Sequence, residues 1–254
     1  MRLDYELDAG SGRRARLGLI VLHVDETVEP ECGRLLDIDG VAVYCSRIRS
    51  GEAATADSLS AMAERLPEAA SLLPPAVDFS AIGYACTSGA TLIGPERVHA
   101  LVRHGRPIRG GSGDTAVTDP LSAVVAACRA LDVRRPAFVS PYVPEVSAAL
   151  RGALEQRGVE IAAFGSFEES EERRVARIDG ASVLEAVTRV GATPDCDGVF
   201  VSCTNLRTLD IIPAAEARLG VPVLASNQVL AWHLLRSAGI DASPGVGGRL
   251  FEQA

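Results

Sequence analysis

Short apolar runs alternate with amphipathic stretches along almost the whole chain. The apolar runs have the length of buried strands, and the stretches between them have helical periodicity. Strands are predicted at 17–22, 41–45, 81–85, 137–140, 159–164, 198–202 and 221–224, with a weaker one at 107–109. Helices are predicted at 29–36, 55–73, 95–103, 120–131, 145–156, 169–178, 181–190, 208–219 and 227–238. This alternation predicts an α/β fold with parallel strands and crossover helices, and a ligand site beyond the carboxyl ends of the strands.

The two halves of the chain repeat one order of elements. In the first half, the strand at 17–22 is followed by the segment 24–29; in the second half, the strand at 137–140 is followed in the same way by 141–145. Each half then contains a later strand that ends in Cys-Thr. We therefore expect two similar lobes, each a parallel sheet of about four strands flanked by helices. The first lobe is expected to comprise 17–115 and 221–254, and the second 116–220. The chain is expected to cross between them at 110–113, with the active site between the lobes.

Composition and charge exclude several classes of function. The chain has 254 residues, is 47% hydrophobic and carries a net charge of −8, which argues against nucleic acid as a partner. No apolar run approaches the roughly 20 residues that span a membrane. The charged N-terminus lacks the apolar core of a signal peptide, so a cytoplasmic location is expected. Six cysteines without Cys-x-x-Cys spacing or paired histidines make a metal site or a disulfide framework improbable.

All 25 basic residues are arginine, and this has a chemical consequence. Pyridoxal phosphate enzymes and Schiff-base aldolases need a lysine, and so does a Walker-type phosphate loop. These classes are excluded, and no cofactor is expected.

Two segments carry the same motif at the end of a predicted strand. They are 82–89 (IGYACTSG) and 199–206 (VFVSCTNL). In each, an apolar run ends in Cys-Thr and a helix-like stretch follows. Cys86 and Cys203 are therefore expected at or near a helix N-terminus, where backbone N–H groups and the helix dipole lower the pKa of a thiol. Two such thiols predict a pseudo-symmetric site with one cysteine on each side of a substrate.

This pair of cysteines suggests acid–base chemistry at one carbon atom. One thiolate would remove a proton from a carbon next to a carboxylate, and the opposite thiol would deliver one. The developing enediolate needs hydrogen-bond donors. The residues directly after each cysteine can supply them: Thr87, Ser88, Thr204 and Asn205. A buried cysteine is otherwise a small apolar residue, and this interpretation is preferred for the other four: Cys32, Cys45, Cys128 and Cys196.

Together these motifs resemble the aspartate/glutamate racemase superfamily, and within it the maleate cis-trans isomerase and arylmalonate decarboxylase branch. The resemblance covers nearly the whole chain, and the two Cys-Thr segments in this order are its most specific part. Supporting matches lie at 18–21, 27–31, 141–142, 203–208 and 226–232. The resemblance implies two lobes with cofactor-free chemistry between them. It also implies that Tyr142 hydrogen bonds to a substrate carboxylate.

The chain departs from the maleate isomerase pattern at two places. That branch carries an asparagine where this chain has Asp25 followed by Glu26, and a second asparagine near Glu171 or Glu172. Carboxylates in the site would repel a dicarboxylate and attract a cationic group. The segment 24–27 also resembles racemase-like proteins associated with ectoine utilisation, which implies an amino-acid-like substrate such as an acylated diaminobutyrate. A purely structural interpretation is equally suited to these residues. Asp25 and Glu26 can cap the following helix and place a carboxylate in its first turn, and the acidic run 168–174 can form the solvated start of a helix.

These observations predict a cofactor-independent racemase or isomerase that acts next to a carboxylate with Cys86 and Cys203 as acid and base. A maleate-type cis-trans isomerase, in which one thiolate adds to a double bond, is an alternative. The decarboxylase branch keeps only the second cysteine, which disfavours that activity. A non-catalytic binder on the same scaffold is a further alternative, because fold alone does not fix function. The expected partner is a small-molecule carboxylate, and the sequence leaves a homo-oligomer open.

Overall fold

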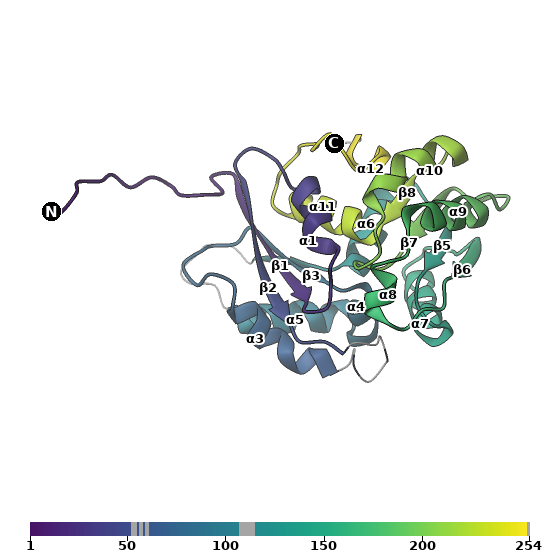
Figure 1. Cartoon of the computed structure of the whole chain (residues 1–254), viewed down its shortest axis with the longest axis horizontal. Helices are drawn as coiled ribbons and strands as arrows, with labels where there is room; N and C mark the ends of the chain where they lie inside the picture. Colours follow the sequence, from purple (N-terminus) through teal and green to yellow (C-terminus); the bar gives the residue numbers. More distant parts are fainter. Residues whose placement is uncertain (52–54, 56–57, 59–60, 107–114, 253–254) are drawn as a thin grey trace.

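Two separate parallel sheets form the centre of the protein (Figure 1). The computed structural model describes residues 1–51, 55, 58, 61–106 and 115–252. The first sheet has the strand order β2-β1-β3-β4 and is built from β1 (Ala15–Leu22), β2 (Val41–Ile48), β3 (Ala81–Ala85) and β4 (Ala116–Thr118). The second has the order β6-β5-β7-β8 and is built from β5 (Pro136–Ser140), β6 (Ala163–Ser166), β7 (Gly198–Val201) and β8 (Val223–Ala225). The predicted fold class, two similar α/β lobes, is confirmed.

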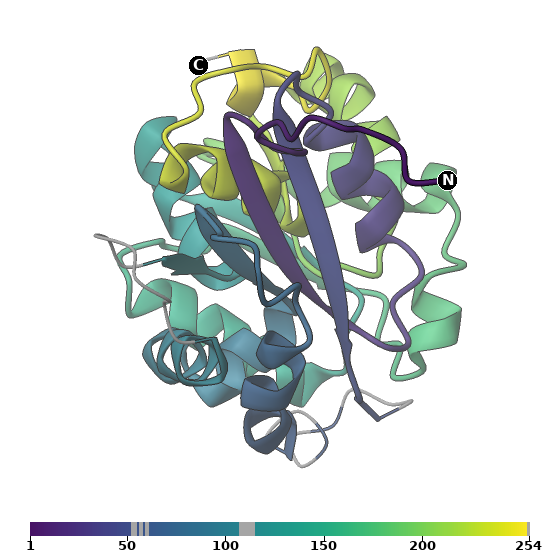
Figure 2. The ribbon, with the colours of Figure 1, turned by 90° about the vertical axis from the view of Figure 1, so that its left-hand side faces the viewer.

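Helices connect the strands and cover both sheets, and β2 forms the outer edge of the first sheet (Figure 2). In the first half of the chain they are α1 (Val28–Leu35), α3 (Leu66–Ser71), α4 (Thr87–Ile93), α5 (Pro95–Gly105) and α6 (Pro120–Ala130). In the second half they are α7 (Pro144–Glu155), α8 (Glu172–Val175), α9 (Gly180–Gly191), α10 (Ile212–Leu219), α11 (Ser226–Ser237) and α12 (Arg249–Glu252). Short 3-10 helices lie at Met62–Arg65 and Leu209–Ile211. No helix in the described ranges is long and apolar enough to cross a membrane.

The inner strands of each sheet are apolar over their whole length because helices cover both faces. Every residue of β3, β5 and β7 is buried, which explains why these strands read as continuous apolar runs. Val21 of β1 pairs with Ala85 of β3, and Val139 of β5 pairs with Val201 of β7. The two inner strands of each sheet therefore end at the same level, and the residues that follow them lie at one edge.

Helix α11 joins the two lobes. It follows β8 of the second sheet without a loop and packs against β3 and β4 of the first. Gly83 of β3 permits this close approach, because a Cβ atom there would lie 3.2 Å from the Cδ1 atoms of Leu230 and Leu234. The first turn of α11 is thereby held between the two sheets.

Two strands, β4 and β8, belong to the other lobe from the one predicted. The segment from 221 onward was expected to return to the first lobe, but β8 pairs with β7, whereas α11 packs against the first sheet. The reason is a short β7–α10–β8 connection, which places the next parallel strand beside the previous one. Residues 116–118 were assigned to the second lobe, but they form β4 on the edge of the first sheet.

Several element boundaries also differ from the prediction. The helix expected at 55–73 is, in its described part, helical at 58 and from 61 to 71, with a 3-10 turn at Met62–Arg65 before the short α3. The strand expected at 159–164 begins later, at Ala163, and the helix expected at 169–178 is only the one-turn α8. The weak strand at 107–109 and the crossing at 110–113 lie outside the described residues.

Candidate active site

Cys86 lies at the junction of β3 and α4. It is the N-cap of α4, and its sulfur accepts a hydrogen bond from the Gly89 N–H at 3.2 Å. The Ser88 hydroxyl lies 3.7 Å from the same sulfur. A Cβ atom at position 89 would lie 2.9 Å from the Cys86 sulfur and 2.5 Å from the Tyr84 hydroxyl, so only glycine fits there. The strand-to-helix position predicted for this cysteine is observed.

One residue, Ser202, separates Cys203 from the end of β7, and no helix begins at Cys203. A turn at 204–205 and a bend at 206 come next, and the following 3-10 helix starts only at Leu209. Cys203 itself has φ of 100°, in the left-handed region that non-glycine residues rarely adopt. The expectation of a helix N-terminus at Cys203 was therefore wrong, because a turn takes the place of the first helical residues.

The two thiols also differ from expectation in their pKa. Each cysteine is 2% exposed. Burial raises the pKa of Cys86 to about 12, although the Gly89 N–H and the hydroxyl groups of Ser88 and Tyr84 lower it. Burial also raises the pKa of Cys203 well above its usual value, and the negative charges of Glu172 and Asp25 add to the increase. Desolvation thus outweighs the stabilising donors, and burial favours the neutral form of both thiols.

The two Cys-Thr segments contact each other across the lobes. The Thr204 hydroxyl lies 3.4 Å from the Ala85 carbonyl oxygen, and the Thr87 hydroxyl lies 2.8 Å from that of Ser226. Ser226 in turn accepts the Cys203 N–H at 3.0 Å. The carboxyl ends of β3 and β7 are therefore joined by hydrogen bonds, and both sulfurs belong to one buried region.

Tyr142 lies close to both thiols. It is 2% exposed and follows β5, where the Ser140 hydroxyl accepts its N–H at 3.1 Å and the hydroxyls of Ser147 and Ser166 donate to its carbonyl oxygen. Burial raises the pKa of the Tyr142 hydroxyl, and the nearby thiols of Cys203 and Cys86 raise it further. These contacts hold the main chain of Tyr142, and its hydroxyl hydrogen bonds to Cys203.

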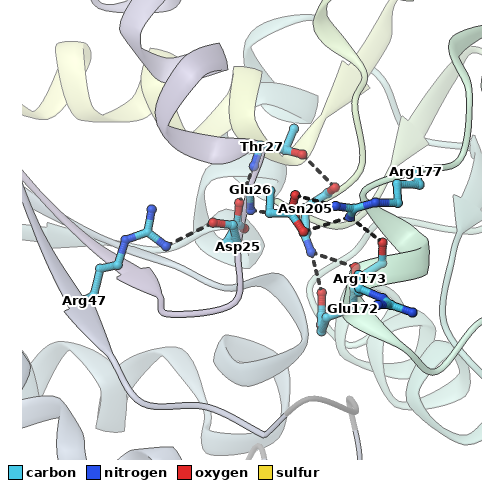
Figure 3. Close-up of polar contacts among 8 residues, drawn as sticks. All are labelled: Asp25, Glu26, Thr27, Arg47, Glu172, Arg173, Arg177 and Asn205. Atoms are coloured by element: carbon cyan, nitrogen blue, oxygen red, sulfur yellow. Dashed lines mark hydrogen bonds and ion pairs between the residues drawn. The ribbon is translucent and has the colours of Figure 1, made fainter.

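The two acidic residues after β1 have different surroundings (Figure 3). Asp25 is 3% exposed, and its Oδ1 accepts hydrogen bonds from the N–H groups of Thr27 and Val28 at 2.8 Å each, so it stabilises the turn that leads into α1. Its Oδ2 is buried and has no hydrogen-bond partner among the described residues. Glu26 is exposed and forms a bidentate ion pair with Arg177, at 2.8 and 3.0 Å. Glu26 was expected to face the substrate, but its carboxylate lies at the surface.

Asn205 is a bridge between the lobes (Figure 3). Its Oδ1 accepts the Glu26 N–H at 2.9 Å, and its Nδ2 donates to the carbonyl oxygen and to Oε2 of Glu172, at 3.0 and 2.9 Å. Its own carbonyl oxygen accepts the Thr27 hydroxyl. The side-chain amide that was expected to bind substrate is thus fully used within the protein.

Glu172 is the member of the site that sequence reasoning missed. It is 6% exposed, whereas the acidic run 168–174 reads as solvated. Burial raises its pKa, and its charge acts on Cys86, Cys203 and Tyr142. The available signal was the departure from the maleate isomerase pattern at 171 or 172; of these two residues, Glu172 is buried and Glu171 is exposed.

No cluster of potential metal ligands occurs among the residues that the structure describes. His23, at the end of β1, is exposed and bonded to Ser50. Arg207, which could have bound a carboxylate, is exposed and donates to the Ile178 carbonyl oxygen. The buried polar groups near the thiols therefore come from the strand ends, α8 and the first turn of α11.

A family model described as arylmalonate decarboxylase matches residues 109–251. The chain belongs to this family. Arylmalonate decarboxylase of Bordetella bronchiseptica is 38% identical over 136 residues, which cover 52% of this chain and 56% of that protein. Maleate isomerase of Nocardia farcinica is 28% identical over 249 residues, 94% of this chain and 96% of that protein.

Solved structures of both enzymes have the same fold. A mutant of the Nocardia farcinica maleate cis-trans isomerase with a covalently bound succinylcysteine intermediate superposes with a TM-score of 0.85 at 27% identity, over 94% of this chain and 99% of that one. A double mutant of arylmalonate decarboxylase, with a glycine changed to cysteine and a cysteine to serine, superposes with a TM-score of 0.83 at 26% identity, over 94% and 100%. The predicted resemblance to the maleate isomerase and arylmalonate decarboxylase branch is confirmed.

Proposed function

We propose that this protein is a cofactor-independent isomerase that acts at a carbon next to a carboxylate, with Cys86 and Cys203 as the acid–base pair. The observation that carries the proposal is the meeting of the two Cys-Thr segments. Each thiol follows an inner strand, both are buried, and hydrogen bonds through Thr87 and Ser226 join the segments. Retention of two buried thiols in one site favours catalysis over simple binding, since a binder needs neither.

The surroundings of the two sulfurs suggest which one carries the negative charge. Beyond the effect of burial, the Gly89 N–H and two hydroxyl groups lower the pKa of Cys86, and the charge of Glu172 raises it. The pKa of Cys203 is raised by burial, by Glu172 and by Asp25, and the Tyr142 hydroxyl and the Asn205 N–H lower it. The Cys86 thiolate is therefore the less costly of the two. In a racemisation it would take the proton from the substrate carbon, and the Cys203 thiol would protonate the opposite face. The enzyme would end with the proton on Cys86 and the charge on Cys203, so the reverse reaction starts from the product state.

Donors for the substrate carboxylate remain available after the internal bonds are counted. The Ser88 hydroxyl lies beside the first thiol, and the Tyr142 hydroxyl lies near both. The hydroxyls of Thr87 and Thr204 are bonded to Ser226 and to the Ala85 carbonyl oxygen, so they would reach a substrate only by exchanging these partners. These groups would stabilise the enediolate that forms when the proton leaves. Asn205 would act indirectly, because its amide holds Glu172 and the loop after β1.

The charge of the site favours an amino-acid-like substrate. Asp25 and Glu172 are both buried, their charges act on each other, and the Asp25 Oδ2 has no partner among the described residues. A second substrate carboxylate would meet two acidic groups, whereas an ammonium group would stabilise their charged forms. An acylated diaminobutyrate, of the kind that the likeness to ectoine-utilisation proteins implies, would satisfy this requirement. A cytoplasmic location and a homo-oligomer stay predictions.

A maleate-type cis-trans isomerase is the second candidate. The Nocardia farcinica relative is named for this reaction, and its mutant structure holds a succinylcysteine. On this chain, the Cys86 thiolate would add to one alkene carbon and the Cys203 thiol would protonate the other. Rotation about the new single bond and loss of the same proton and thiolate would release the isomer.

Turnover of a defined panel in D₂O distinguishes the candidates. The panel comprises free amino acids, N-acyl diamino acids and maleate, with deuterium incorporation measured by mass spectrometry and geometry by NMR. The proposal predicts α-deuteration of an amino-acid-like member and little reaction of maleate. Efficient conversion of maleate to fumarate without α-deuteration of any amino acid would favour the cis-trans isomerase. No reaction of any member would leave the acid–base proposal without support.

A further inference from the structure

Cys203 has a backbone conformation that its neighbours must hold in place. Four non-glycine residues in the described part of the chain have positive φ. Three of them are exposed acidic residues with φ between 53° and 62°: Asp132, Glu168 and Asp195. Cys203 is buried and has φ of 100°. Such a conformation persists only where surrounding contacts determine it.

The contact that does so comes from the first residue of α11. Ser226 is fully buried, and its hydroxyl oxygen accepts the Cys203 N–H at 3.0 Å. The same hydroxyl lies 2.8 Å from that of Thr87, the residue next to Cys86. Asn227 donates to the Thr204 carbonyl oxygen at 2.8 Å and so holds the segment from its other side. One side chain, Ser226, thus touches the segments of both thiols.

We propose that Ser226 is a positioning residue: by accepting the Cys203 N–H and bonding to Thr87, its hydroxyl holds the two thiols in the relative arrangement that proton transfer requires. This inference rests on the proposed two-thiol chemistry. It assigns Ser226 no contact with substrate, because its oxygen is already used by the protein.

Removal of the hydroxyl should affect Cys203 selectively. The buried N–H would lose its acceptor, and the backbone would relax toward negative φ, which turns the thiol away from its present direction. Cys86 would keep its place, because the α4 N-cap and the Gly89 N–H do not depend on Ser226. A displacement of about 1 Å at a reacting group can lower a rate by about 10²-fold.

Thiol alkylation tests this positioning without any substrate. Wild type, Ser226→Ala and Ser202→Ala are treated with iodoacetamide, and the rate at each cysteine is followed by peptide mass spectrometry. Ser202→Ala is the matched control, since Ser202 precedes Cys203, is buried, and has a hydroxyl without a partner among the described residues. We expect the rate at Cys203 to rise by about tenfold or more in Ser226→Ala alone. The buried Cys32 and Cys128 report general loosening of the fold.

A parallel rise at Cys32, Cys128 and Cys203, or no change at Cys203, would overturn the inference. Kinetics supply an independent arm once a substrate is identified. Ser226→Ala should lower kcat by about 10²-fold with KM nearly unchanged, and Ser226→Thr should restore part of it. If Ser226 and Thr87 act as one unit, Thr87→Val should lower kcat much less in the Ser226→Ala background than in wild type. Equal effects in both backgrounds would contradict the shared role.

Discussion

Replacing Asn205 by alanine removes the side chain that ties the loop after β1 to α8. Three hydrogen bonds disappear: one from the Glu26 N–H, and two to the carbonyl oxygen and Oε2 of Glu172. Neutral bonds contribute about 1 kcal/mol each, and a bond to a charged group contributes about 1.5–3 kcal/mol. Water can replace part of the Glu26 contact, which lies near the surface. We expect a loss of about 3 kcal/mol in the free energy of unfolding, or roughly 6–12 °C in Tm for a chain of this size.

Urea denaturation followed by circular dichroism measures this loss. The control is Arg177→Ala, which breaks the exposed ion pair to Glu26 at the same junction and should leave the midpoint nearly unchanged. A loss below about 1 kcal/mol in Asn205→Ala, together with loss of substrate binding, would refute the assignment of Asn205 as an internal bridge. It would return this residue to the substrate-binding role that the sequence predicts.

Three further predictions concern charge, pH and backbone strain. The double variant Asp25→Asn, Glu172→Gln should raise turnover of maleate relative to an amino-acid-like substrate by about tenfold or more, and an unchanged ratio would exclude these carboxyls from selectivity. Burial raises the pKa of Cys86 to about 12, so the fraction of Cys86 present as thiolate grows with pH throughout the neutral range. We therefore expect kcat/KM to rise continuously from about pH 7 to about pH 9. A plateau in that interval would contradict the assignment of Cys86 as the base. Cys203→Gly should be more stable than Cys203→Ala by about 1 kcal/mol in urea denaturation, because glycine adopts φ of 100° freely, and the reverse order would count against strain at this position.

The inner strands and the first thiol could be predicted because local signals suffice there. β3, β5 and β7 are buried on both faces and are therefore continuous apolar runs in the sequence. Cys86 follows such a run directly and precedes a stretch that forms α4. The edge strand β8 is only three residues long. It belongs to the second sheet because it pairs with β7, and no local sequence pattern indicates which strand it will pair with.

The remainder of the site depends on contacts between segments distant in the chain. The acidic run 168–174 has the composition of a solvated helix, yet Glu172 is buried because Asn205 of the other strand end holds it. The turn at Cys203 is stabilised by Ser226, which lies 23 positions further on. Burial is the largest influence on the pKa of each thiol. At Cys86 it raises the pKa more than the N–H group at the start of α4 lowers it, and the sequence motif indicates only the second of these effects.

The most direct test of the two-thiol mechanism compares Cys86→Ala and Cys203→Ala with Cys128→Ala. Cys128 is a buried cysteine within helix α6, and burial and Asp197, rather than the groups of the site, raise the pKa of its thiol. Turnover of the substrate found in the D₂O panel is measured for each variant, with circular dichroism and Tm as controls for folding. The proposed mechanism predicts that both site variants lose turnover while remaining folded, and that Cys128→Ala keeps it. Near-normal turnover by either folded site variant would contradict the mechanism.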